Sequence, residues 1–460
     1  MTFRTTLPKC RSAVWQSLFL IIWGLTFSQN SRAQQSAPLH LTLDQAIDLA
    51  LRQNHSIHLR SLAVEDMRNK KDEARSNYLP QMSASAGVHH VTELAGVEIP
   101  AGAFGNFAPT GPVPSKSLFI DQGGATAYTG GVGLEQPLTQ LFRIHQANLA
   151  AKQDVLVAQT QLDQTQNGVA LQTRQLYYRA LINQQQLEAS QAQLEAATIK
   201  NGEAQGDVEH GNALEIATIE SKAAILEAQQ HSLTVRLQGE DLKRQLADLL
   251  GLPIGTQIDL DSNVPSLTTD VPSRSEAIRL ALEQNQDIRV ARETLDKTKA
   301  GLAAAKDAYI PDITGSSRYS YQSGVPLLVH NFGTFGFSLS YDLFDGGRRE
   351  AQIRDARTAV TSARVTVDKL ESEISVQVQS AYDRVEVLEE TVDVAAQVVA
   401  VRTEAARLAD RQFEQNAALS SVRRQAHADL SSAAASLLEA SLNLSLAEAN
   451  LKTIMGQNSR

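Results

Sequence analysis

The sequence predicts an α+β membrane protein in which long helices are joined to short pairs of transmembrane strands. Three observations predict this fold class. One stretch of about 68 residues contains neither glycine nor proline, another stretch alternates strictly between apolar and polar residues, and the whole arrangement occurs twice along the chain.

The long uninterrupted stretch is 348–415, which directly follows Gly346 and Gly347. Since glycine and proline are the residues that most often end helices, it predicts one helix about 100 Å long. Its apolar residues recur every three or four positions from Val367 to Val399, which is typical of a coiled-coil seam. More valines lie off that seam, namely Val365, Val376, Val387, Val394 and Val398. They indicate neighbours on two sides, although a wide core-facing stripe in a helical bundle is the alternative.

The alternating stretch is 334–343. Its odd positions are apolar and its even positions are polar or glycine, over a length that suits a membrane-spanning strand. We therefore expect one lipid-facing set, made of Phe335, Phe337, Leu339, Tyr341 and Leu343. A half-buried strand of a soluble sandwich would show the same alternation. The strand's predicted partner is 312–321. In the first half of the chain the corresponding strands are predicted at 81–91 and 125–138, with a long external loop at 92–124.

The duplication divides the chain. Residues 46–54 match 277–285, and Gly251 matches Gly456 at a second, constant offset. We expect a first repeat at 34–251, a linker at 252–272 and a second repeat at 273–460. Each repeat should contain a helix, a strand–loop–strand unit and a long helical hairpin. In the first repeat the expected helices are 44–77, which Asp44 caps, and the pair 139–200 and 213–250, which a break at 202–211 separates. In the second repeat the first helix begins at Ser273 or Ser275, and the long pair is 348–415 and 417–455.

The N-terminus is predicted to be a secretory signal peptide. Basic residues precede an apolar run at 14–27, and cleavage is expected between Ala33 and Gln34. A membrane anchor is the alternative, but the run is short for a span. The only cysteine, Cys10, lies in the expected leader, so disulfides and thiolate metal sites are not expected. The acidic net charge of −9 argues against nucleic acid as a partner.

Two strands in each repeat give four strands in each chain. Four antiparallel strands cannot close a barrel, and open strand edges are not tolerated in lipid. The chain must therefore oligomerise so that strands from several copies close one barrel. Three chains would give twelve strands and would bring their long helices into one ring. No histidine or carboxylate spacing suggests a metal, a cofactor or a catalytic site, and no enzyme is predicted.

The chain resembles the TolC-like outer membrane efflux protein family over nearly all of the mature sequence. The resemblance rests on 46–54 and its copy, Tyr78-Leu79-Pro80 and Tyr309-Ile310-Pro311, and the segments 342–349 and 413–420. It implies a homotrimeric passive exit duct, in which a 12-stranded transmembrane barrel in the outer membrane is continued by a helical coiled-coil tunnel in the periplasm. It also implies partners, namely a periplasmic adaptor protein and an inner-membrane transporter of the RND, ABC or MFS type, in an efflux or type I secretion system.

The resemblance places the closed end of the tunnel, where an adaptor docks, at two turns. They comprise Glu209, His210, Gly211, Asn212, Ala213 and Leu214 in the first repeat, and Phe413, Glu414, Gln415, Asn416, Ala417, Ala418 and Leu419 in the second. Where some members of the family carry aspartates that narrow the pore, this chain has Arg423 and Arg424. These are candidates for gating, with ordinary solvated arginines as the alternative. The alternative function is a non-conducting structural coiled-coil protein of the periplasm or cell surface, and the exported substrate is left open.

Overall fold

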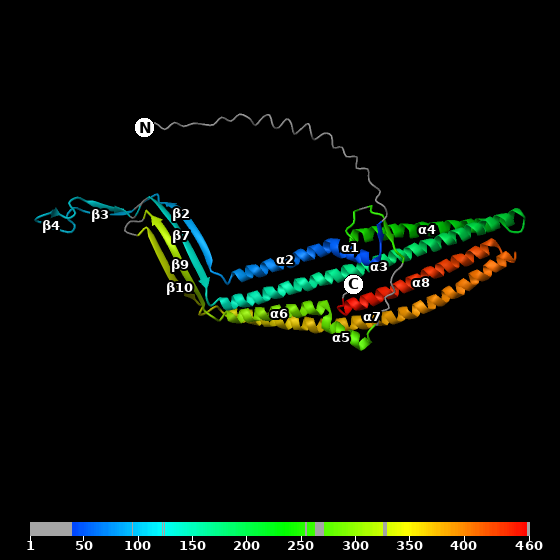
Figure 1. The fold of residues 1–460 in the computed structure, drawn as a ribbon. Helices are drawn as coiled ribbons and strands as arrows, with labels where there is room; N and C mark the ends of the chain where they lie inside the picture. The colour runs from blue at the N-terminus through cyan, green and yellow to red at the C-terminus, as the bar shows by residue number, and fades with distance from the viewer. Residues whose placement is uncertain are drawn as a thin grey trace, which may run out of the picture.

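The computed structural model is an elongated molecule with a small sheet at one end and helical hairpin turns at the other (Figure 1). It describes residues 39–93, 95–121, 123, 125–253, 255–262, 271–324 and 329–457. The expected signal peptide, with Ala33 and Gln34, lies outside the described residues. None of the described helices is both long and apolar enough to cross a membrane.

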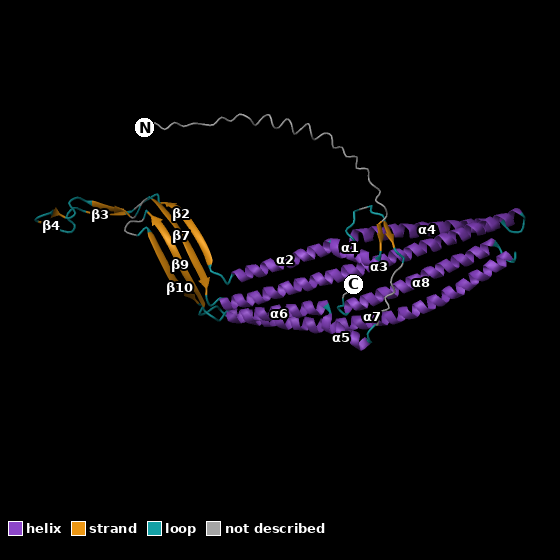
Figure 2. Ribbon diagram, viewed as in Figure 1, coloured by secondary structure: helices purple, strands orange, loops and turns teal. Residues whose placement is uncertain are grey.

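The sheet has four antiparallel strands, in the order β10-β9-β7-β2 (Figure 2). They are β2 (Gln81–His90), β7 (Thr126–Pro137), β9 (Asp312–Ser323) and β10 (Asn331–Ser340). The structure confirms all four predicted strands, and the two repeats contribute one hairpin each. Within the described residues, the outer edges of strands β2 and β10 are unpaired.

The prediction that the last strand continues to Leu343 is wrong. Strand β10 ends at Ser340, so Tyr341 and Leu343 lie beyond it. The chain changes direction here because Gly346 and Gly347 have positive φ angles of 67° and 84°, a conformation in which glycine has no Cβ to clash. Only Phe335, Phe337 and Leu339 of the predicted set belong to the strand, and they are 91%, 81% and 67% exposed.

The strand register places most of the large apolar side chains on one face of the sheet. This follows because directly opposed residues of antiparallel strands point to the same side. Met82 opposes Leu134, and Val132 opposes Tyr319. Leu339 opposes Ile313 on the same face. The opposite face carries mainly serine, threonine, glutamine and glycine, together with Glu135 and Arg318. The sheet is therefore apolar on one side and polar on the other, as a barrel wall requires.

The segment predicted as a loop at 92–124 contains two small antiparallel ribbons. Strand β3 (Gly96–Ile99) pairs with β6 (Leu118–Asp121), and β4 (Asn106–Phe107) pairs with β5 (Gly111–Pro112). They extend the β2–β7 hairpin beyond the sheet, away from the helices (Figure 1). The strands are too short for their alternation to be recognised among the surrounding glycines and prolines.

Two helices run almost the whole length of the helical part: α3 (Leu141–Glu209) and α7 (Arg348–Glu414). Each turns back into a shorter helix, α4 (Glu215–Leu249) after α3 and α8 (Ser420–Ile454) after α7. The prediction for α7 is confirmed. The predicted break at 202–211 is wrong, because α3 continues to Glu209. Glycines inside a helix cost about 1 kcal/mol each, which the packing of α3 against its neighbours outweighs.

The helix predicted at 44–77 is two helices, α1 (Leu43–Gln53) and α2 (His55–Ser76). The cap is Thr42 and not Asp44: the Thr42 hydroxyl accepts from Gln45 N–H, and the Gln45 side chain accepts from Thr42 N–H. The second repeat has the same division into α5 (Arg274–Gln284) and α6 (Gln286–Asp307). Its N-cap is Ser273, one of the two predicted residues.

Buried asparagines produce both divisions. Asn54 Oδ1 accepts a hydrogen bond from Ser56 N–H at 2.9 Å, and its Nδ2 donates to the Leu249 carbonyl at 3.0 Å. In the second repeat, Asn285 Oδ1 accepts from Asp287 N–H at 2.8 Å, and its Nδ2 donates to Ile454 at 2.9 Å. One side chain therefore caps the second short helix and also holds the carboxyl end of the returning helix.

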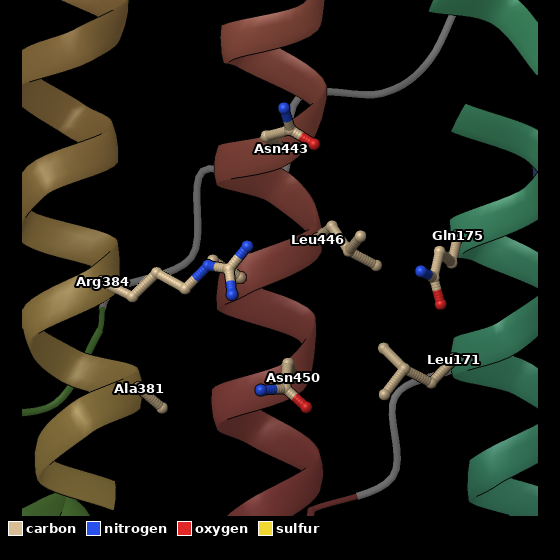
Figure 3. A pocket seen from close by; sticks show the side chains of 8 residues that line it. Leu171, Gln175, Ala381, Arg384, Asn443, Leu446 and Asn450 are labelled. Atoms are coloured by element: carbon tan, nitrogen blue, oxygen red, sulfur yellow. The ribbon is translucent and has the colours of Figure 1, made fainter. Parts of the chain in front are cut away.

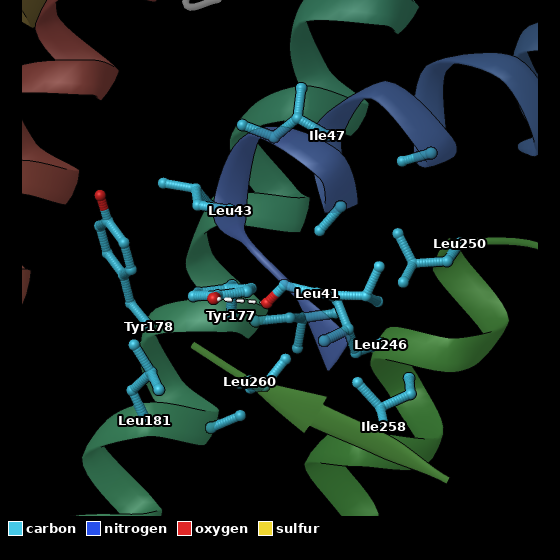
Figure 4. Packing of buried hydrophobic residues seen from close by; sticks show 14 of the residues in the cluster. Leu41, Leu43, Ile47, Tyr177, Tyr178, Leu181, Leu246, Leu250, Ile258 and Leu260 are labelled. Carbon is cyan, nitrogen blue, oxygen red and sulfur yellow. Dashed lines mark hydrogen bonds between the residues drawn. The ribbon is translucent and has the colours of Figure 1, made fainter. Parts of the chain in front are cut away.

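A small parallel sheet, here called the belt, lies against the middle of the helices. Strands β1 (Leu39–Leu41) and β8 (Ile258–Leu260), which the sequence analysis did not predict, pair in parallel. The Tyr177 hydroxyl donates to the carbonyl of Leu41 at the end of β1 at 2.9 Å (Figure 4) and to that of Asp261, directly after β8, at 2.8 Å. Tyr177 therefore joins α3 to both strand ends. Burial raises the pKa of Tyr177 to about 12.

The helices form one curved layer. Towards the sheet, α3 packs on both α2 and α6, and α6 packs on α7. Towards the turns, α3 packs on α4 and α8, and α8 packs on α7. In the half that leads to the turns, the layer therefore begins with α4 and ends with α7, and these two helices are its edges.

Candidate functional site: the hairpin tip and the open edges

The two hairpin turns have the same backbone structure. In the first, His210 N–H donates to Gly206, Gly211 to Val208 and Asn212 to Asp207. In the second, Gln415 donates to Arg411, Asn416 to Phe413 and Ala417 to Gln412. Gly211 and Asn416 occupy equivalent positions with φ of 75° and 54°. Asparagine is among the residues that tolerate this left-handed conformation, so the exchange of glycine for asparagine leaves the turn unchanged.

Both turns expose an apolar side chain at the same position. Leu214 is 78% exposed and Leu419 is 59% exposed, and each is the N-cap residue of its returning helix. Ile216, two residues after Leu214, and Val422, three residues after Leu419, are also exposed. The predicted tip residues therefore form two matching turns at the end of the molecule, and each turn exposes one leucine side chain.

The two predicted arginines make different contacts. Arg423 lies over the Phe413 ring, 4.3 Å from its centroid, and so contacts its own hairpin. Arg424 Nη1 lies 3.2 Å from Glu195 Oε1 on α3, in the other hairpin. Arg424 therefore links the two repeats near the tip, whereas Arg423 does not.

Further contacts support this link between the hairpins. Glu203 on α3 accepts a hydrogen bond at 2.9 Å from Ser421 N–H, in the first turn of α8. A carboxylate at a helix N-terminus is favoured because the exposed N–H groups there carry partial positive charge. Within the second hairpin, His427 Nε2 lies 2.9 Å from Asp410, and Arg402 lies 3.1 Å from Asp429. Sequence reasoning missed these partners, because they lie far apart along the chain.

The edge helices expose apolar stripes. On α7 the stripe consists of Val365, Val376, Val387, Val394, Val398 and Val401, which are 45–69% exposed. The seam of α7, by contrast, is buried or half-buried. On α4, Ile219, Leu226 and Leu233 recur at seven-residue intervals and are followed by Leu237, and all four are exposed. A shallow groove lies between Leu226 and Leu237. Both edges of the helical layer therefore present apolar surface that no part of the described chain covers.

A small cavity of about 180 Å³ lies where α3, α7 and α8 meet (Figure 3). Its lining includes Leu171 and Gln175 of α3, Arg384 of α7, and Asn443 and Asn450 of α8. Its polar lining consists of amides and one guanidinium, without a carboxylate, and the rest of the lining is aliphatic. In the described part of the chain, no group of three or more histidine, cysteine, aspartate or glutamate residues is placed to hold a metal ion.

The polar face of the sheet holds a charged residue that sequence reasoning missed. Arg318 of β9 donates to Ser85 of β2 at 2.7 Å, across β7. It fits because Gly131 and Gly133 of β7 have no side chains there: a Cβ on Gly131 would lie 3.3 Å from the guanidinium. The arginine and the two glycines of the adjacent strand gave no signal before the register was known.

Arg349 organises the joint between the sheet and α7. Its Nε donates to Asp345 at 2.7 Å, and its guanidinium lies over the rings of Tyr341 and Tyr309. The hydrogen bond from Arg349 lowers the pKa of Asp345 to about 2. Tyr341, which was predicted to face lipid, instead lies against this arginine.

The fold occurs in solved outer-membrane channels. A membrane protein from Pseudomonas aeruginosa is 19% identical, with 90% of each chain covered and a TM-score of 0.72. The CmeC outer membrane channel of Campylobacter jejuni is 15% identical, with a TM-score of 0.73 over 90% of this chain and 85% of that one. The MtrE outer membrane channel of Neisseria gonorrhoeae is 20% identical, with a TM-score of 0.71 over 91% and 89%. This likeness confirms the predicted fold class.

A curated relative is the alkaline protease secretion protein AprF of Pseudomonas aeruginosa, which is 23% identical over 265 residues. The match covers 56% of this chain, and the chain spans about half the length of that relative, 55%. The family model for outer membrane efflux proteins matches residues 46–252 and 277–457, one match in each half of the chain. The chain belongs to the outer membrane efflux protein family.

Proposed function

We propose that this protein is the outer-membrane exit duct of an efflux or type I secretion system, and that it passively conducts substrates from a periplasmic adaptor and an inner-membrane pump to the outside. One observation carries the proposal: both layers of the chain are open at both edges. The sheet ends in β2 and β10, and the helical layer ends in α4 and α7. If several copies form a closed ring, the edge strands of neighbouring chains pair and their edge helices pack on one another, so that neither layer keeps an open edge.

A homotrimer is the assembly that these edges support. Unpaired N–H and C=O groups on β2 and β10 need partners in lipid, so β10 of one chain pairs with β2 of the next. Three chains give twelve strands. In the same ring the exposed valines of α7 pack on the leucines of the neighbouring α4. The apolar face of the sheet, with Phe335, Phe337 and Leu339, then faces lipid, and Arg318 faces the lumen.

The tip is the proposed docking surface for the adaptor. Leu214 and Leu419 project from turns with the same backbone hydrogen bonds, so three chains present six exposed leucine side chains in similar turns. The inner-membrane transporter, whether of the RND, ABC or MFS class, would act through that contact. In this proposal the transporter selects the cargo, and the duct conducts it.

Arg424 is the proposed gating residue, because it ties α8 to α3 through Glu195. An ion pair exposed to this degree contributes about 1 kcal/mol or less to stability. The three Arg424–Glu195 pairs of a trimer would therefore hold the tip closed weakly enough for adaptor binding to break them. Arg424→Gln should increase the open fraction in planar bilayers, and so should Glu195→Gln. Arg411→Gln, on an exposed residue near the same tip, is the control. The charge-swapped pair Arg424→Glu with Glu195→Arg should restore closure. An unchanged open fraction in both single variants would remove Arg424 from the gate.

The function itself is tested with the purified protein and with cells. We expect a heat-sensitive trimer on gels, recovery in outer-membrane fractions, and ion conductance in planar bilayers. Leu226→Asp with Leu233→Asp should abolish the trimer, whereas Glu227→Gln on the same helix should not. A soluble periplasmic protein without conductance would instead establish the alternative, a structural coiled-coil protein.

A further inference from the structure

A tyrosine followed two residues later by an arginine occurs on the long helix of each repeat. The pairs are Tyr177 and Arg179 on α3, and Tyr382 and Arg384 on α7. Tyr177 is bonded to the belt, and the Tyr382 ring lies 5.0 Å from the guanidinium of Arg274 on α5. Helix residues two positions apart point about 160° away from each other. Both arginines therefore point away from the belt and α5, on the opposite face of the helical layer.

The two arginines lie at the same level of the layer, on either side of α8. Asn443 of α8 lines a groove with Arg179, between α3, α4 and α8. Asn443 also lines the small cavity with Arg384, and in Figure 3 the Arg384 side chain extends from α7 towards α8. Both arginines are exposed. One face of three neighbouring helices therefore carries two guanidinium groups with an amide between them.

The carboxylates of this face have other partners. Two of them line the groove beside α3. Glu439 accepts a hydrogen bond from Gln186 at 3.3 Å, and Asp241 lies 3.0 Å from Arg244. Within the described residues, neither arginine of the face makes an ion pair. Their charges are therefore available to a ligand.

The dimensions of a twelve-helix ring show which face of the layer is the inner one. Helices about 10 Å apart place their axes on a circle of about 19 Å radius, and the inner surface at about 14 Å. Three belts, each with its α1, and three copies of α5 would largely fill that space, because each helix is about 10 Å thick. They must lie outside if the duct is to conduct. The face with Arg179 and Arg384 is then the inner wall.

We propose that Arg179 and Arg384 of three chains form a ring of six guanidinium groups on the tunnel wall, which binds passing anions and slows cations. This inference rests on the exit duct proposed above. Guanidinium donors match the oxygens of carboxylate and phosphate groups, and the Asn443 amide adds a neutral donor. The side chains extend inward from the wall, to within about one Debye length of the axis, 8 Å at physiological salt. Glu439 offsets part of the charge, since each chain brings two arginines and one glutamate.

Ion selectivity in planar bilayers tests the ring. The permeability ratio of chloride to potassium is obtained from the reversal potential of the purified full-length trimer in a KCl gradient. Arg179→Gln with Arg384→Gln should lower this ratio about fivefold at about 0.1 M salt. The difference should fade at about 1 M, where the Debye length is about 3 Å. Replacing both arginines by lysine should keep the ratio, and Glu439→Gln should raise it.

The matched control removes a positive charge from the other face. Lys243 of α4 is exposed and lies two residues after Asp241, which lines the groove, so it points away from the tunnel. Lys243→Gln should leave the permeability ratio unchanged. An equal decrease in Lys243→Gln and in the double glutamine variant would overturn the inference, because net charge and not the ring would then set the selectivity.

A single cysteine makes the test independent of how a variant folds. Arg384→Cys, in a chain that carries Cys10→Ser, is measured in one bilayer before and after labelling. A cationic thiosulfonate reagent should raise the permeability ratio, and an anionic reagent of similar size should lower it. If the two reagents produce no difference in a conducting trimer, residue 384 does not face the ion path, and the ring is refuted.

The outcomes distinguish the ring from the duct. A conducting trimer whose permeability ratio is the same with and without the two arginines overturns the inference and leaves the proposed function intact. If the unmodified chain forms no trimer or does not conduct, the proposed function fails, and the inference fails with it.

Discussion

The buried asparagine of the second repeat is the most informative residue to change. Asn285 is 5% exposed, and one side chain makes three backbone contacts. Its amide donates to Ile454, and its carbonyl oxygen accepts from Asp287 and Ile288. Asn285→Ala removes all three contacts without adding volume. The effect should therefore report on the joint between α5, α6 and the end of α8, and not on steric strain.

The magnitude follows from these contacts. Loss of an N-cap side chain costs about 1 kcal/mol. Loss of the bond to Ile454 costs about 1 kcal/mol more, since it leaves a half-buried carbonyl without its side-chain donor. The opening free energy of the joint should fall by about 2 kcal/mol, which corresponds to roughly thirtyfold faster amide exchange. Asn285→Asp should recover the capping part alone, because it retains the acceptor oxygen and loses the donor.

Hydrogen exchange measured by mass spectrometry on the purified trimer provides the assay. Peptides covering 281–292 and 450–457 should lose protection together, since one side chain holds both segments. Gln284→Ala, on the exposed neighbouring side chain, is the control and should leave both peptides unchanged. Asn54→Ala should reproduce the effect in the first repeat. If Asn285→Ala and Gln284→Ala gave equal exchange, the asparagine would not hold the joint.

Three further results are expected. Tyr177→Phe should weaken the belt by about 1 kcal/mol, measured as heat-induced trimer dissociation. Because burial raises the pKa of Tyr177 to about 12, its neutral form stabilises the fold fully below about pH 10 and loses this effect as the pH rises towards 12, which absorbance of the phenolate reports. Gly456→Ala should destabilise much more than Gly211→Ala: a Cβ would lie 2.2 Å from a backbone carbonyl at Gly456, whereas nothing lies within 4 Å at Gly211. The ion pair of Asp345 with Arg349 should persist in acid, because a lowered pKa preserves its stabilisation until the pH falls towards about 2. Circular dichroism should therefore show no change at this joint between pH 7 and pH 4.

The sequence was sufficient for the long elements of the fold. The long helix at α7 and all four strands of the sheet follow from signals that extend over ten or more residues. The divisions at Asn54 and Asn285 were missed because asparagine is tolerated within a helical pattern, and its capping role appears only when Leu249 and Ile454 are adjacent in space. The duplicated Gln-Asn pairs and the matching Gly251 and Gly456 were visible as a repeat. The structure gives the reason: each glycine packs against the backbone of that pair.

The candidate site was less accessible to sequence reasoning. The turns at 209–214 and 413–419 were located through the resemblance, and their shared hydrogen-bond pattern supports the pairing. The contact of Arg424 with Glu195 depends on how two hairpins lie side by side, so no local spacing reports it. Arg318 was missed for the same reason, since its partner Ser85 belongs to the other repeat.

The angle between the two apolar faces of α7 indicates how many helices form the closed ring of the tunnel. With about 100° of rotation per residue, the buried seam from Val367 to Val399 and the exposed valines from Val365 to Val401 are centred roughly 150° apart around the helix axis. In a closed ring of helices, each member meets its two neighbours at the interior angle of a polygon. For twelve sides that angle is also about 150°. Three chains, each contributing α3, α4, α7 and α8, supply twelve helices. The positions of the valines along this single helix are therefore consistent with a tunnel wall of twelve helices.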